Sequence, residues 1–82
     1  MYVIKRNGEY KPFEMYKVRA AIEKGFASVS QPLDEELIED AMEQLSHKNT
    51  VAVEEVQDTI EKAMYNRGHF EVMRSFMLFR HT

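Results

Sequence analysis

After residue 14, apolar residues recur at intervals of three and four in four successive segments. An α-helix has 3.6 residues per turn, so residues at these intervals lie on one face and can be buried together. The spacing therefore predicts helices over residues 14–27, 33–47 and 54–66, and from residue 69 or 70 to 80. The residues expected to face the core are Val18, Ala21, Ile22 and Phe26 in the first segment, Leu37, Ile38, Ala41, Met42 and Leu45 in the second, Val56, Ile60, Ala63 and Met64 in the third, and Val72, Met73, Phe76 and Met77 in the fourth.

The residues before this helical pattern favour β-structure. Tyr2, Val3 and Ile4 have strong strand propensity. Asn7-Gly8 is a strong hairpin signal, because a type I′ turn requires positive φ at both central residues. Pro12 would end the returning strand. We predict a hairpin over residues 2–13, and a brief third strand or extended lead-in over residues 50–53.

Together these segments predict an α+β domain in which a small β-hairpin or three-stranded sheet caps a four-helix bundle. A chain of 82 residues supports one hydrophobic core, so residues 1–82 are expected to form a single domain. No apolar stretch approaches the roughly 20 residues that span a bilayer, and no secretory signal is evident. We therefore expect a cytoplasmic protein without membrane association.

Several kinds of active site are disfavoured by the composition. The absence of cysteine excludes disulfides, thiolate zinc sites, iron–sulfur clusters and cysteine nucleophiles. His47, His69 and His81 are dispersed, so surface positions are expected for them and a metal site is not. No serine or threonine stands in a recognisable nucleophile–base pattern, and no catalytic residue is expected. The acidic clusters at 34–36 and 54–55 begin predicted helices, where the helix dipole favours negative charge.

Charge is unevenly distributed along the chain. The net charge is −3, yet residues 1–25 hold six basic and three acidic groups. Lys5 and Arg6 border the predicted turn, and Lys17 lies in the first turn of the following helix. These three side chains could form a phosphate clamp, because arginine presents a planar fork to phosphate oxygens and lysine a mobile charge. A solvated basic hairpin is the alternative. Nucleic-acid binding is disfavoured, because the second and third helices are acidic.

Five segments, in order, resemble the ATP-cone family, which occurs at the N-terminus of the ribonucleotide reductase large subunit. Residues 3–8 read V-I-K-R-N-G and are followed by P-F-E at 12–14 and K-V-R-A-A-I at 17–22. Residues 53–58 read V-E-E-V-Q-D, and residues 70–81 resemble the closing helix of the family. The resemblance covers almost the whole chain.

This resemblance implies that the domain binds ATP or dATP, with magnesium, as an allosteric effector controlling the overall activity of a ribonucleoside-diphosphate reductase. By matched position, Lys5, Arg6 and Lys17 would hold the triphosphate. Val3 and Val18 would flank the adenine, and Glu14 could accept a hydrogen bond from its amino group. The implied partners are a catalytic core in the same, longer chain, the reductase small subunit and possible further copies of the domain.

An alternative remains open at this point. Members of the family often carry an acidic residue where Lys11 stands, a threonine where Val53 stands and a basic residue where Thr82 stands. A domain without these polar groups could be a degenerate cone that no longer binds nucleotide and serves as an oligomerisation or interaction module.

Overall fold

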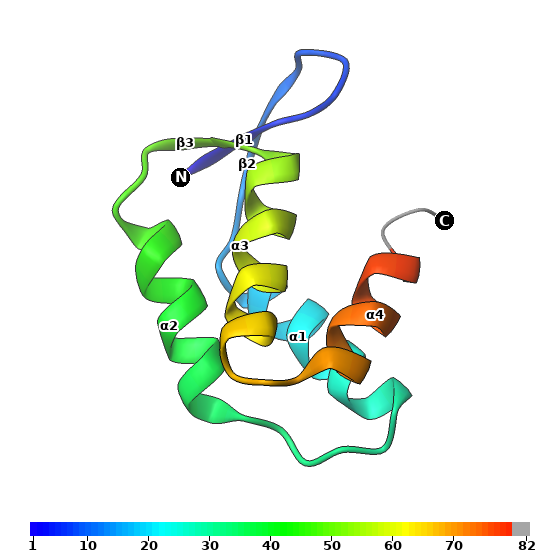
Figure 1. The fold of residues 1–82 in the computed structure, drawn as a ribbon. Coiled ribbons are helices and arrows are strands. Elements are labelled where there is room, and N and C mark those ends of the chain that lie inside the picture. The colour runs from blue at the N-terminus through cyan, green and yellow to red at the C-terminus, as the bar shows by residue number, and fades with distance from the viewer. Residues whose placement is uncertain (80–82) are drawn as a thin grey trace.

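The computed structural model describes residues 1–79 of the chain. Three short strands form one sheet at one end of four helices, as Figure 1 shows. The strands are β1 (Tyr2–Ile4), β2 (Tyr10–Pro12) and β3 (Thr50–Ala52), and the helices are α1 (Tyr16–Ser28), α2 (Glu35–Ser46), α3 (Val53–Asn66) and α4 (Phe70–Phe79). The predicted α+β fold is confirmed, with helix ends within two residues of those expected. The predicted end of the last helix at Arg80 lies outside the described residues.

The hairpin is confirmed, but its turn differs from the predicted one. β1 and β2 pair antiparallel, with Ile4 opposite Tyr10. The Gly8 amide donates to the Lys5 carbonyl, and the Lys5 amide donates to the Glu9 carbonyl, each at 2.9 Å. Only Gly8 in this turn has positive φ, at 86°. This is the pattern of a type I turn followed by a left-handed glycine, so the connection has three residues and the predicted type I′ turn is wrong.

β3 completes the sheet in the order β2-β1-β3 and runs parallel to β1. Val3 and Val51 are register partners, and both side chains are buried. Alternate residues of a strand face opposite sides, so these two valines anchor one face of the sheet to the core. Because α3 begins directly after β3, the sheet fixes where this helix starts.

The predicted apolar stripes form the core, with one exception on α4. Ile22, Leu37 and Met64 are almost completely buried, as are most of their neighbours on the same helical faces. Ala21, Met42 and Met73 are partly buried against the cluster. Met77, however, has 39% of its surface exposed, so the prediction that it fills the core is wrong. α4 packs mainly against α1 and α3 through Val72 and Phe76, which leaves Met77 on its outer side.

A polar cluster joins the start of α2 to the turn between α3 and α4. Asp34 caps α2 by accepting from the Leu37 amide at 3.2 Å. Its other carboxylate oxygen accepts from Arg67 Nε at 2.7 Å and lies 2.9 Å from His69 Nε2. His69 is half-buried with its ring edge-on to Phe26, so the surface position predicted for it is wrong. His47 is exposed as predicted, and His81 lies outside the described residues.

This cluster predicts an acid-sensitive contribution to stability. Partial burial alone would raise the pKa of Asp34, but hydrogen bonds from Arg67, His69 and the Leu37 amide outweigh it and lower the pKa from 3.8 to about 2. A carboxyl with a depressed folded-state pKa stabilises the fold above its unfolded pKa. That stability, about 2 kcal/mol, is lost as the pH falls from about 4 to about 2.

We expect Asp34→Asn to lower the free energy of unfolding at pH 6, and the gap from the parent protein to narrow as the pH falls to 2.5. Urea titrations across this range measure both curves. Asp40→Asn is the control, since Asp40 is largely exposed and 3.7 Å from Arg67, and it should change stability little at any pH. If the free energy of unfolding of the parent protein and of Asp34→Asn changed in parallel with pH, the ionised Asp34 carboxylate would not be the source of the acid-sensitive stability.

Candidate functional site

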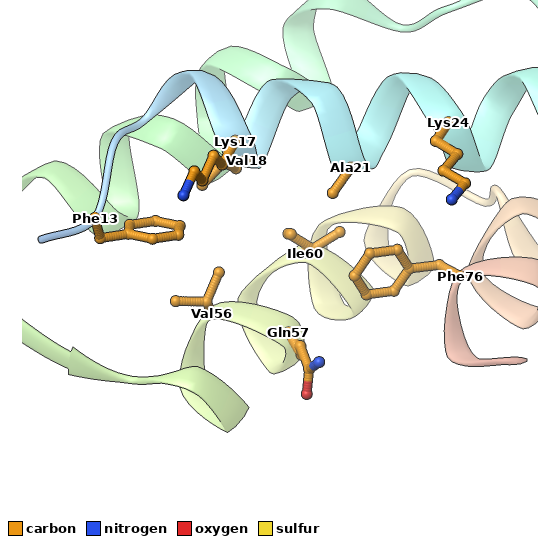
Figure 2. Close-up of a pocket in the computed structure, with 9 residues that line it drawn as sticks. All are labelled: Phe13, Lys17, Val18, Ala21, Lys24, Val56, Gln57, Ile60 and Phe76. Atoms are coloured by element: carbon orange, nitrogen blue, oxygen red, sulfur yellow. The ribbon is translucent and has the colours of Figure 1, made fainter. Parts of the chain in front are cut away.

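A cavity of about 290 Å³ lies between α1, α3 and α4, close to the point where the hairpin leads into α1. Figure 2 shows side chains from all three helices pointing toward this space. The lining residues are Phe13, Lys17, Val18, Ala21, Lys24, Val56, Gln57, Ile60 and Phe76. Its volume approaches the range typical of small-molecule sites.

Helical spacing explains why these residues meet. Lys17, Ala21 and Lys24 follow one another at intervals of four and three, so they share one edge of α1. Val56 and Ile60 stand four apart on α3, facing that edge (Figure 2). Both lysines are exposed, whereas the valine and isoleucine are buried. The cavity therefore has apolar walls and two cationic groups at its border.

Gln57 adds a polar group to these walls. Its Oε1 atom is buried and has no hydrogen-bond partner among the described residues. A buried acceptor without a partner costs free energy on the order of 1–3 kcal/mol, and such groups are uncommon in folded proteins. The oxygen has almost no accessible surface, so a ligand in the cavity would reach it only after the Gln57 side chain turns. The Gln57 side chain is therefore a candidate hydrogen-bonding group in a wall that is otherwise mainly apolar.

Two of the six predicted site residues, Lys17 and Val18, line this cavity. Val3 is instead buried beneath the sheet, with 9% of its surface exposed. Glu14 precedes α1, and its carbonyl accepts from the Lys17 amide at 3.0 Å. The structure thus brings Lys17 and Val18 together at the cavity and places Glu14 just before the helix that carries them.

The two basic residues of the hairpin lie at its turn. Lys5 and Arg6 are exposed and do not line the cavity. Arg6 Nε donates to Glu54 Oε1 in the first turn of α3, at 2.7 Å. The hairpin's arginine is therefore held at the end of a cavity-lining helix. The acidic residues of α3 also do more than complement the helix dipole, since Glu55 pairs with Lys48.

Sequence reasoning missed several lining residues. Lys24 could have been found from its seven-residue spacing from Lys17, which places both on one side of α1. Gln57 lies within a segment that carried the family resemblance, but nothing in the sequence marks its oxygen as unpartnered. Phe76 was predicted as a core residue, and Phe13 was named only within the family resemblance. The packing of α4 against α1 brings Phe76 to the cavity.

Other parts of the structure offer fewer indications of a ligand site. A groove of about 480 Å³ between α2 and α3 is lined by side chains of both charges, including Lys48, Glu55 and Lys62. Within residues 1–79, no group of three or more histidine, aspartate or glutamate side chains could hold a metal ion. None of the helices described is long and apolar enough to span a membrane.

A small sheet capping four helices, with an apolar-walled cavity between three of them, is an α+β domain with a candidate ligand site. The family model for the ATP cone domain matches residues 1–82, which is the whole chain. The chain belongs to the ATP-cone family, whose members generally serve in allosteric regulation by nucleotides.

Similar proteins are ribonucleotide reductases. The chain is 36% identical over 91 residues to the ribonucleoside-diphosphate reductase subunit alpha of Treponema pallidum (strain Nichols), covering 98% of this chain and 11% of that protein. It is 30% identical over 95 residues to the same subunit of Chlamydia pneumoniae, covering 95% and 9%. A vitamin B12-dependent ribonucleoside-diphosphate reductase of Thermoplasma acidophilum is 31% identical over 86 residues, covering 95% and 11%. The chain thus spans about a tenth of the length of these relatives.

Proposed function

We propose that this domain binds ATP or dATP in the cavity between α1, α3 and α4. The observation that carries the proposal is the apolar-walled cavity with the exposed Lys17 and Lys24 at its border. A flat base can pack against these apolar walls, and the Gln57 side chain can form a hydrogen bond with the base or the ribose. The membership of the chain in the ATP-cone family supports the same ligand.

The basic residues are suited to the phosphates. Lys17 and Lys24 are exposed at the border of the cavity, and the turn of the hairpin supplies Lys5 and Arg6. In this proposal Lys17, Lys5 and Arg6 bind the triphosphate, which carries magnesium as it does in solution. Val18 contacts the base directly, and Val3 supports the sheet above it. Glu14 is close enough in sequence to Lys17 to complete the polar side of the site.

The proposed consequence of binding is control of a ribonucleoside-diphosphate reductase. The domain would form one part of a longer, cytoplasmic chain, next to its catalytic core. An effector shifts such an enzyme between states only if it binds those states with different affinities. The contacts that distinguish the states would involve the core, the small subunit or a second copy of this domain.

We expect ATP and dATP to bind the isolated chain more tightly than GTP. Guanine carries a carbonyl where adenine carries its amino group, so it cannot donate a hydrogen bond from that position to Glu14. At a hundred times the Kd, binding adds about 2.7 kcal/mol to stability. For a small domain this raises the Tm by roughly 10–20 °C. Calorimetric and thermal-shift titrations in magnesium measure both quantities, with tripolyphosphate as a control for phosphate binding alone. No response to millimolar ATP or dATP would refute the proposal.

One observation favours the alternative of an interaction module. Tyr65, Phe70, Met77 and Leu78 are exposed apolar side chains on α3 and α4. Exposed apolar groups that cluster on a surface often mark contacts with other proteins. This alternative predicts self-association that depends on protein concentration and not on nucleotide. Sedimentation with and without ATP distinguishes it from the nucleotide-binding function.

A further inference from the structure

Arg6 is held by the carboxylate of Glu54. Its Nε atom lies 2.7 Å from Glu54 Oε1, and the two residues are 48 positions apart in the chain. The pair therefore ties the turn of the hairpin to the first turn of α3. The Arg6 and Glu54 side chains are 67% and 44% exposed. An ion pair this exposed is weak, at about 0–1 kcal/mol, and can exchange partners readily.

The carboxylate that holds Arg6 lies beside the cavity. Glu54 and Gln57 are three residues apart on α3, so their side chains are neighbours on one face of the helix, with Cβ atoms about 5–6 Å apart. Gln57 is one of the residues that line the cavity. The Arg6–Glu54 pair is therefore one helical turn from the proposed nucleotide site, at the end nearest the hairpin.

A carboxylate and a phosphate offer arginine the same kind of contact, since both present paired anionic oxygens to the guanidinium fork. We infer that Glu54 competes internally with the nucleotide's terminal phosphate for Arg6, so that binding of a triphosphate exchanges one anionic partner for another and releases the hairpin turn from α3. This inference rests on the proposed function. It assigns Glu54 a regulatory role at that site.

The competition lowers affinity in a way that depends on the length of the phosphate chain. A triphosphate that reaches Arg6 must first break the pair with Glu54. A nucleotide too short to reach Arg6 leaves the pair intact and incurs no such cost. Glu54 therefore reduces the preference for ATP over AMP, and it keeps the hairpin fastened to α3 until a triphosphate arrives.

The test is Glu54→Gln, which keeps the shape of the side chain and removes its charge. We expect this substitution to tighten ATP binding roughly two- to fivefold. This fold-change corresponds to the free energy of breaking one exposed ion pair. AMP affinity should change less. The expected gain in ATP affinity should disappear when Arg6 is also replaced by alanine. Without Arg6, the Glu54 carboxylate and the terminal phosphate have no shared partner for which to compete, so the double-mutant cycle isolates this effect.

Glu55→Gln is the matched control. Glu55 is the other acidic residue in the first turn of α3, so both variants lose one negative charge and the same interaction with the helix dipole. Glu55 pairs with Lys48 and not with Arg6. We therefore expect ATP affinity to change less in Glu55→Gln than in Glu54→Gln, and the Tm values without ligand should be similar.

Calorimetry on the parent protein, Glu54→Gln, Arg6→Ala, the double variant and Glu55→Gln separates the possible failures. If the parent protein binds ATP and Glu54→Gln binds it no more tightly than Glu55→Gln does, the competition is refuted while the proposed function stands. An equal gain in the Arg6→Ala background also refutes it, because the effect is then general charge repulsion. If Glu54→Gln binds ATP more tightly than both the parent protein and Glu55→Gln do, and this gain is lost in the Arg6→Ala background, the competition is supported. If no variant binds ATP or dATP, the proposed function fails and the competition fails with it.

Discussion

Lys17→Ala is expected to weaken ATP binding about tenfold or more while leaving the domain folded. Lys17 is exposed at the border of the cavity, on the first turn of α1. A charge-assisted hydrogen bond to phosphate contributes roughly 1.5–3 kcal/mol, and 1.4 kcal/mol corresponds to a factor of ten in the Kd. Its side chain buries no apolar surface in the core cluster, so the Tm without ligand should change little.

Lys62→Ala is the control for charge alone. Lys62 lies in the groove between α2 and α3, away from the apolar cavity. Lys62→Ala removes one positive charge, as Lys17→Ala does. A screened charge at a distance from the ligand contributes little to binding. Calorimetric titration of both variants at two salt concentrations is the measurement. Similar small losses for the two variants would mean that Lys17 is ordinary surface, and the nucleotide site would have to be abandoned.

Phe26→Ala is expected to reduce the free energy of unfolding by about 3–5 kcal/mol. Phe26 is 1% exposed, and its ring lies edge-on to His69 with centroids 4.9 Å apart. Removing the ring leaves a cavity where α1 meets the turn before α4, and it also removes the surface against which His69 packs. Small domains have only about 5–15 kcal/mol of stability in total, so this one change should remove a large part of it.

Urea denaturation followed by circular dichroism measures this loss. Tyr16→Ala is the control within the same helix, since Tyr16 is also aromatic but 61% exposed. We expect it to cost less than about 1 kcal/mol. Equal losses for the two variants would contradict the packing described for α1. Phe26 does not line the cavity, so Phe26→Ala should affect ATP binding only through the fraction of folded protein.

The sequence alone determined the helices and the hairpin. Val18, Ala21 and Ile22 can share the buried face only if residues near 16–28 are helical, because a strand would place the adjacent Ala21 and Ile22 on opposite faces. Gly8 likewise marked the hairpin, although it takes up its positive φ as the third residue of the connection. Such local patterns are readable because they depend on backbone geometry within a few residues. The same patterns and the ordered family motifs indicated the ATP-cone domain.

The tertiary structure alone decided how distant residues meet. Gln57 became a candidate ligand contact only when the packing of α1, α3 and α4 formed the cavity that it lines. The sequence predicted Arg6 as a phosphate ligand, and the structure shows that it also pairs with Glu54, 48 residues away. The sequence predicted a surface position for His69, and the structure shows it in contact with Asp34 and Phe26. Each of these contacts joins segments far apart in the chain, and no local preference of the backbone encodes the partner that a side chain meets after folding.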